Sequence, residues 1–64
     1  MNINEFLKRH NFGEVEKNLL ISIIEHSETA IELSKNIAET FKILLNLSQV
    51  EALRNSYYAE YSNG

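Results

Sequence analysis

Small polar residues followed three positions later by Glu recur along this chain. The four pairs are Asn2/Glu5, Asn11/Glu14, Thr29/Glu32 and Ser48/Glu51. In such a pair the first side chain accepts a hydrogen bond from an unpaired amide of a first helical turn, and the Glu reaches back to the preceding backbone. Each pair therefore marks a helix start. We predict an all-α fold, a small bundle of three to four helices in a single domain over residues 1–64.

Apolar residues at helical spacing between these starts predict where each helix runs. The predicted helices cover residues 3–10, 14–26, 29–46 and 49–61. Because the sequence has no Pro, and its two Gly are Gly13 and Gly64, no strong helix breaker lies between Thr29 and Tyr61. One continuous helix over residues 29–61 is therefore the alternative.

The shortness of the chain bears on its oligomeric state. A chain of 64 residues buries a smaller share of its surface than a larger domain does. No Cys is present for a disulfide, and no closely spaced ligand set suggests a structural metal. We therefore expect a second copy to complete the core in a homodimer. The predicted dimer interface consists of Leu20, Ile21, Ile24, Phe41 and Leu45.

Charge and hydropathy restrict the class of partner. The formal net charge is -3, and the six Lys and Arg residues lie scattered among Glu. Binding of duplex DNA through its phosphates needs a clustered basic face, so direct nucleic-acid binding is not expected. No apolar run approaches the roughly 20 residues of a membrane span, and the first residues lack the pattern of a signal peptide. We expect a cytoplasmic protein without membrane contact.

No pattern in the sequence indicates catalysis. The two imidazoles, His10 and His26, lie near predicted helix ends, where a cation complements the helix dipole. No Cys or Asp stands beside them as a metal ligand. The sequence also lacks a nucleophile elbow and a Gly-rich phosphate loop. We predict a protein that is not an enzyme, with no catalytic residue, metal site or cofactor.

Three tyrosines follow one another near the end of the chain. Tyr57 and Tyr61 share one face of the predicted last helix, and Tyr58 points about 100° away. Tyrosine is favoured at interfaces because it combines apolar area with a polar tip. Since one face of the helix packs on the core, we predict that Tyr58 contacts a partner.

Residues 14–33 resemble part of the AbbA-type antirepressor family of spore-forming bacteria. The shared pattern is an acidic start, Lys-x-Leu-Leu, an Ile-rich second turn, a His, and Ala-Ile-Glu-Leu opening the next helix. It covers about a third of the chain. The residues that carry the resemblance are Lys17, Leu19, Leu20, Ile24, His26, Ala30, Ile31, Glu32 and Leu33.

This resemblance implies a small helical homodimer that binds the DNA-binding domain of the transition-state repressor AbrB. It implies that the protein keeps the repressor off DNA by mimicking nucleic acid. Mimicry needs acidic side chains spaced along a surface. The acidic set implied here is Glu25, Glu28, Glu32 and Glu39, and Tyr58, predicted above from its helical position, completes the predicted partner-binding residues.

Our main hypothesis is therefore a regulatory interaction protein that inhibits a DNA-binding regulator. The alternative is a small helical DNA-binding regulator with a helix-turn-helix in residues 29–58, in which Gln49, Arg54 and Asn55 read bases. A structural or chaperone-like subunit of a secretion or phage apparatus fits the composition equally well.

Overall fold

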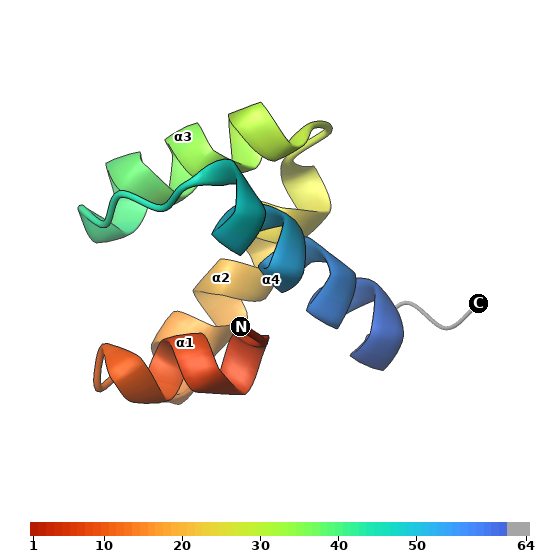
Figure 1. Ribbon diagram of the computed structural model, residues 1–64. Coiled ribbons are helices and arrows are strands. Elements are labelled where there is room, and N and C mark those ends of the chain that lie inside the picture. Colours follow the sequence, from red (N-terminus) through yellow and green to blue (C-terminus); the bar gives the residue numbers. More distant parts are fainter. Residues whose placement is uncertain (62–64) are drawn as a thin grey trace.

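Four helices make up the computed structural model, which describes residues 1–61 (Figure 1). Within that range the structure contains no strand, so the all-α prediction is confirmed. The helices are α1 (Ile3–Arg9), α2 (Glu14–His26), α3 (Ala30–Phe41) and α4 (Leu47–Glu60). The bounds predicted for α2 are confirmed, and α1 and α4 end one residue earlier than predicted.

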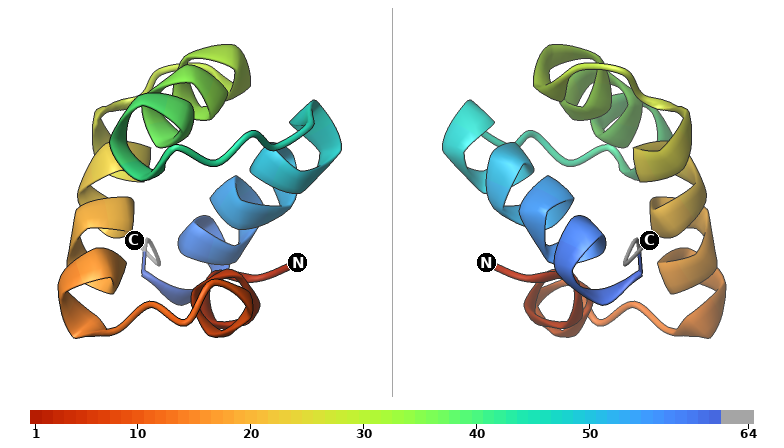
Figure 2. Two further views of the ribbon diagram at one scale, coloured as in Figure 1. Left: turned by 90° about the vertical axis from the view of Figure 1, so that its left-hand side faces the viewer. Right: turned by 90° about the vertical axis from the view of Figure 1, so that its right-hand side faces the viewer.

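The helices close around one core. Figure 2 shows that the first turns of α2 lie beside α1 and that its last turns lie beside α3. The fourth helix, α4, packs against the other three. Every helix contributes at least two buried apolar side chains. The buried set is Ile3, Phe6, Leu7, Leu20, Ile24, Leu33, Ile37, Val50 and Leu53. A single copy of the chain thus assembles its own core.

Two of the predicted helix starts are confirmed. At α1, Asn2 Oδ1 accepts a hydrogen bond from the Glu5 amide at 2.8 Å, and the Glu5 carboxylate accepts one from the Asn2 amide at 2.9 Å. At α3, Thr29 Oγ1 accepts from the Glu32 amide at 3.1 Å. The Glu32 carboxylate, however, accepts from the Glu28 amide, one residue before the cap.

The start predicted at Asn11/Glu14 is wrong, because Asn11 ends α1 instead. Asn11 has a left-handed backbone with φ 57°, a conformation that Asn tolerates better than most residues. Its amide donates to the Lys8 carbonyl at 3.2 Å, and the Phe12 amide donates to the Leu7 carbonyl at 2.8 Å. This pair of bonds is a Schellman motif, which satisfies the last carbonyls of the helix.

Gly13 takes the place of Asn11 as the N-cap of α2. Its amide donates to the Glu16 carboxylate at 2.8 Å, which is the half of a capping box that does not need a side chain on the first residue. The predicted first helical residue of α2, Glu14, is nevertheless correct.

The junction between α2 and α3 is built around one buried polar side chain. Ser27 Oγ donates to the Ile23 carbonyl at 2.7 Å and accepts from Asn36 Nδ2 at 2.9 Å. Ser27 is thus the residue at which α2 ends, and its hydrogen bond with Asn36 connects this break to the second turn of α3. The predicted break at residues 27–29 is confirmed, although no Gly or Pro enforces it.

The third helix ends five residues earlier than predicted, so a continuous helix over residues 29–61 is also wrong. Lys42 adopts a left-handed backbone with φ 60°, and residues 42–46 are not helical. In this segment Ile43 and Leu45 pack against the core, while Leu44 between them is exposed. The Ser34 hydroxyl donates to the Leu45 carbonyl at 3.4 Å, which holds the segment against α3.

The cap predicted at Ser48/Glu51 is displaced by two residues. Asn46 Oδ1 accepts from the Gln49 amide at 2.8 Å, and Gln49 Oε1 accepts from the Asn46 amide at 3.1 Å. Gln serves as well as Glu in this position. Ser48 therefore lies inside the first turn of α4 and is exposed.

Alanine substitutions distinguish these two caps. Asn46→Ala is expected to lower the free energy of unfolding by about 1 kcal/mol, because the Gln49 amide loses its acceptor. Ser48→Ala, which removes no cap, is expected to change it by less than about 0.5 kcal/mol. Urea unfolding followed by circular dichroism measures both, and an equal loss in the two variants would contradict the cap at Asn46.

Candidate protein-binding surface

Tyr57 and Tyr58 of α4 and Tyr61, which caps its C-terminal end, form one aromatic cluster rather than lying on separate faces. The rings of Tyr57 and Tyr61 are stacked at 5.9 Å between centroids, and the Tyr58 ring meets Tyr57 edge-on at 5.5 Å. Tyr57 packs against the core, whereas Tyr58 and Tyr61 keep 49% and 40% of their surface exposed. These ring contacts thus join side chains from two faces of the helix into one continuous patch of tyrosine rings.

Contacts from α2 hold this cluster in place. The Tyr57 hydroxyl donates to Glu25 Oε2 at 2.8 Å, across 32 positions in the sequence. Lys17 Nζ lies 5.9 Å from the centroid of the Tyr61 ring, within the range of a cation–π interaction. Lys17 and Glu25 lie on one side of α2, so the last turns of α4 follow that side.

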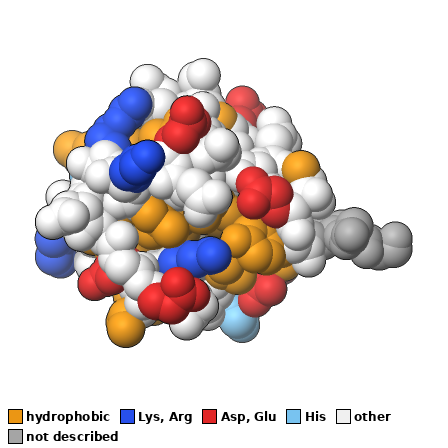
Figure 3. Space-filling view, turned by 90° about the horizontal axis from the view of Figure 1, so that it is seen from below, with side chains coloured by type: hydrophobic (Ala, Val, Ile, Leu, Met, Phe, Trp, Pro, Cys, Tyr) orange, Lys and Arg blue, Asp and Glu red, His pale blue; other side chains and the backbone are white. Residues whose placement is uncertain are grey.

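Arg54 links the cluster to the junction between α2 and α3. Its Nη2 donates to the Glu28 carbonyl at 3.0 Å, and its Cζ lies 5.9 Å from the centroid of the Tyr58 ring. We call the resulting patch the tyrosine surface. It consists of Lys17, Glu25, Glu28, Arg54, Tyr57, Tyr58 and Tyr61. Figure 3 shows hydrophobic side chains gathered at the C-terminal end of α4, with charged side chains around them.

The hydrogen bond between Tyr57 and Glu25 changes how this phenol titrates. Because the Glu25 carboxylate holds the phenolic proton, the pKa of Tyr57 lies above its usual value of 10.0. Desolvation and the negative charge of Glu25 act in the same direction, since both disfavour the phenolate. A phenol whose pKa is higher in the folded than in the unfolded state stabilises the fold below pH 10, and that contribution is lost as pH rises through the folded-state pKa.

Absorbance of the phenolate measures this shift directly. In the double variant Tyr58→Phe, Tyr61→Phe the remaining phenol is Tyr57, and we expect it to titrate above the pH at which an unfolded tyrosine does. Adding Glu25→Ala is expected to return its pKa toward the ordinary value. An identical titration with and without the Glu25 carboxylate would contradict the bond.

The predicted partner-binding residues are brought together in part. Glu25, Glu28 and Tyr58 belong to the tyrosine surface, and Glu32 adjoins it because its carboxylate accepts from the Glu28 amide. Glu39 lies two helical turns further along α3, toward its other end. It shares a stripe of α3 with Glu32 but is not part of the tyrosine surface.

The residues predicted for the dimer interface lie mainly within a single copy. Leu20 and Ile24 are 0% and 3% exposed, so they have no surface to offer a second copy. Phe41 and Leu45 pack against the same core, and Ile21 is half-buried. The large aliphatic side chains that remain exposed are others, namely Val15, Leu19, Ile31, Leu44 and Leu47.

The residues considered for reading DNA bases are mostly engaged within the protein. The Gln49 side chain accepts a hydrogen bond in the cap of α4, and Arg54 donates to the Glu28 carbonyl. Asn55 remains exposed. Two of the three side chains are thus held by hydrogen bonds within the protein, which argues against the base-reading alternative.

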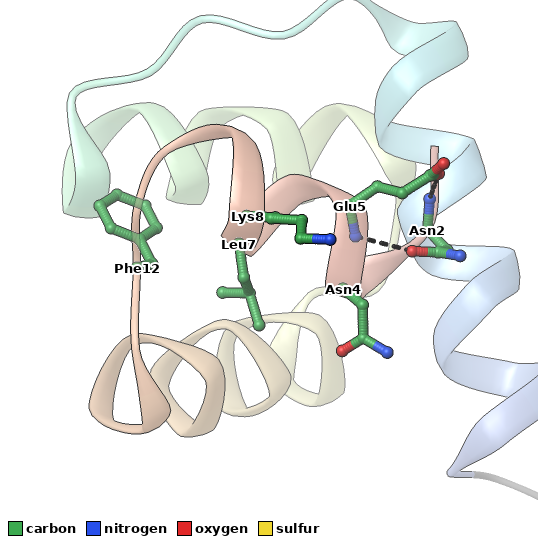
Figure 4. A pocket seen from close by; sticks show the side chains of 6 residues that line it. All are labelled: Asn2, Asn4, Glu5, Leu7, Lys8 and Phe12. Carbon is green, nitrogen blue, oxygen red and sulfur yellow. Dashed lines mark hydrogen bonds between the residues drawn. The ribbon is translucent and has the colours of Figure 1, made fainter.

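A hollow of about 370 Å³ lies along α1, apart from the tyrosine surface (Figure 4). It is lined by Asn2, Asn4, Glu5, Leu7, Lys8 and Phe12. Asn2 and Glu5 are bonded to each other in the helix cap, and Leu7 is buried in the core. The hollow thus offers fewer available polar groups than the tyrosine surface, which we take as the candidate site.

Over residues 1–61 the structure brings together no group of three or more His, Asp or Glu side chains that could hold a metal ion. No helix in the same range is long and apolar enough to cross a membrane. The chain matches no protein-family model, and no curated protein or solved structure is significantly similar to it.

Proposed function

We propose that this protein is a non-enzymatic regulatory interaction protein of the bacterial cytoplasm, which binds a DNA-binding transcription regulator and blocks its contact with DNA. The observation that carries this proposal is the tyrosine surface. Tyr58 and Tyr61 expose large, rigid aromatic area at the C-terminal end of α4, a helix that is itself anchored in the core. Exposed tyrosines of this kind are enriched among the side chains that dominate the affinity of protein interfaces.

The acidic side chains beside the tyrosines support a basic partner. The Glu25 carboxylate accepts from a phenol and the Glu32 carboxylate accepts from a backbone amide, so both bonds leave the negative charge in place. The surfaces with which regulators bind DNA phosphates are basic. Opposite charges across an interface accelerate association and orient the two proteins.

The resemblance of residues 14–33 to the AbbA-type family supports the same class of partner and implies a homodimer. Because Leu20 and Ile24 are buried within one copy, a second copy would bind to other apolar side chains. Val15 and Leu19 lie one turn apart on the exposed side of α2 and form the largest such pair on one helix. Sedimentation of the pure protein measures whether the dimer exists.

A mobility-shift experiment tests the proposal. A repressor of the AbrB type is bound to its operator, and the protein is added at increasing concentration. We expect the repressor–DNA shift to disappear, and Tyr58→Ala to need about tenfold more protein, as loss of an interface anchor does. Leu44→Ala, an exposed change on the segment between α3 and α4, serves as the matched control.

Two outcomes would overturn the proposal. If the protein alone retards DNA in a salt-sensitive manner, the DNA-binding alternative is correct. If Tyr58→Ala inhibits as well as the wild type, the tyrosine surface is not the interface. Thermal unfolding of Tyr58→Ala shows whether a loss of inhibition reflects a loss of structure.

A further inference from the structure

A hollow of about 320 Å³ opens on α4 at the edge of the tyrosine surface. It is lined by Glu51, Arg54, Asn55 and Tyr58, which follow one another at helical spacing on one side of α4. A carboxylate, an amide and a phenol ring therefore converge on one space. The side chains of Glu51, Asn55 and Tyr58 are all exposed.

The charged side chains that line this hollow are one carboxylate, Glu51, and one guanidinium, Arg54. The Arg54 guanidinium is already engaged, since it donates to the Glu28 carbonyl at 3.0 Å and packs against one side of Tyr58. The Glu51 carboxylate is therefore the charged group of this lining that remains exposed and available to a ligand.

We propose that this hollow receives an arginine side chain of the partner protein. The planar guanidinium stacks on the exposed Tyr58 ring and donates hydrogen bonds to the Glu51 carboxylate and the Asn55 amide oxygen. The same surface already holds two cations against phenol rings, Lys17 over Tyr61 and Arg54 over Tyr58. Arginine fits better than lysine because its flat fork both stacks and donates in one plane.

This inference rests on the proposed function, since it names the group of the partner that the surface recognises. It nevertheless has its own test, which needs no partner protein. N-acetylarginine methylamide is titrated into the intact protein at physiological salt, and backbone amide shifts are followed by nuclear magnetic resonance. We expect saturable shifts at Glu51, Asn55 and Tyr58. The citrulline analogue, which has the same shape without the charge, is expected to give none.

Variants define the binding groups. Glu51→Gln is expected to weaken binding of the arginine probe about threefold to fivefold, the loss typical of an exposed ion pair. Glu14→Gln, which removes an equal charge from the first turn of α2 outside the tyrosine surface, is expected to leave the affinity unchanged. Tyr58→Phe retains the ring and is expected to retain binding.

Three results would overturn the proposal: no saturable shift with the arginine probe, equal shifts with citrulline, or tighter binding of inorganic phosphate at the same amides. The last result would make Arg54 an anion site. Failure here is separable from failure of the proposed function. If Tyr58→Ala abolishes inhibition of the repressor while the probe does not bind, the function stands and the arginine site does not.

Discussion

Phe6→Ala is expected to leave about half or more of the molecules unfolded at room temperature. Phe6 is fully buried and lies at the centre of an aromatic group, with ring centroids 4.8 Å from His10, 6.1 Å from Phe12 and 6.3 Å from Phe41. Removing a buried phenylalanine ring costs about 3–5 kcal/mol, because the cavity it leaves closes only in part. A core in a chain this short supplies about 3–5 kcal/mol in total. The loss thus matches the whole stability of the domain.

Circular dichroism with urea unfolding measures this effect. Phe12→Ala is the matched control, because Phe12 belongs to the same aromatic group but is only half-buried. We expect it to remain folded with a smaller loss. If the free energy of unfolding of Phe6→Ala lies within about 1 kcal/mol of the wild-type value, far below the cost of a buried ring, α1 does not pack on the core through Phe6.

Leu53→Ala is expected to have the second largest effect, about 2–5 kcal/mol. Leu53 is 0% exposed and fixes α4 to the other helices, whereas Leu47 on the same helix is 49% exposed. The same substitution at Leu47 is therefore expected to change stability by about 0.5 kcal/mol or less. Both variants replace Leu with Ala, so urea unfolding of the two isolates the effect of burial. Similar losses in the free energy of unfolding would show that α4 does not pack through Leu53.

Leu53→Ala also bears on function. The tyrosines lie one and two turns beyond Leu53, so loosening α4 displaces the surface that they form. We expect this variant to inhibit a repressor poorly at temperatures where it is partly unfolded and to recover on cooling. Tyr58→Ala, in contrast, is expected to inhibit poorly at all temperatures, because its defect is local.

Several helix starts follow from local chemistry alone. The capping bonds at Asn2 and Thr29 join residues three positions apart, so they form wherever the neighbouring residues are helical. The bounds of α2 follow similarly from its apolar spacing. The all-α fold was predictable for this reason, since each element is encoded over a few turns.

The choice between competing local signals was not predictable. Ser48 and Asn46 are both good caps, and a cap contributes only about 1 kcal/mol. Packing of Ile43 and Leu45 against the core in a non-helical segment outweighs that difference and moves the start of α4 to Leu47. Asn11 likewise could begin α2 as its N-cap or end α1. The Schellman bonds to α1 show that it ends α1.

The candidate site divides in the same way. The sequence predicted Tyr58 as a partner contact from its residue type and helical position, which are local properties. Glu25, Glu28 and Glu32 were predicted only through the family resemblance. Only the tertiary structure brought Tyr57 to Glu25 and Arg54 to Glu28, pairs 32 and 26 positions apart. It also decided that Leu20 and Ile24 face inward while Val15 and Leu19 stay exposed. The apolar residues of α2 surround much of the helix, so the side that is buried depends on where the other helices pack.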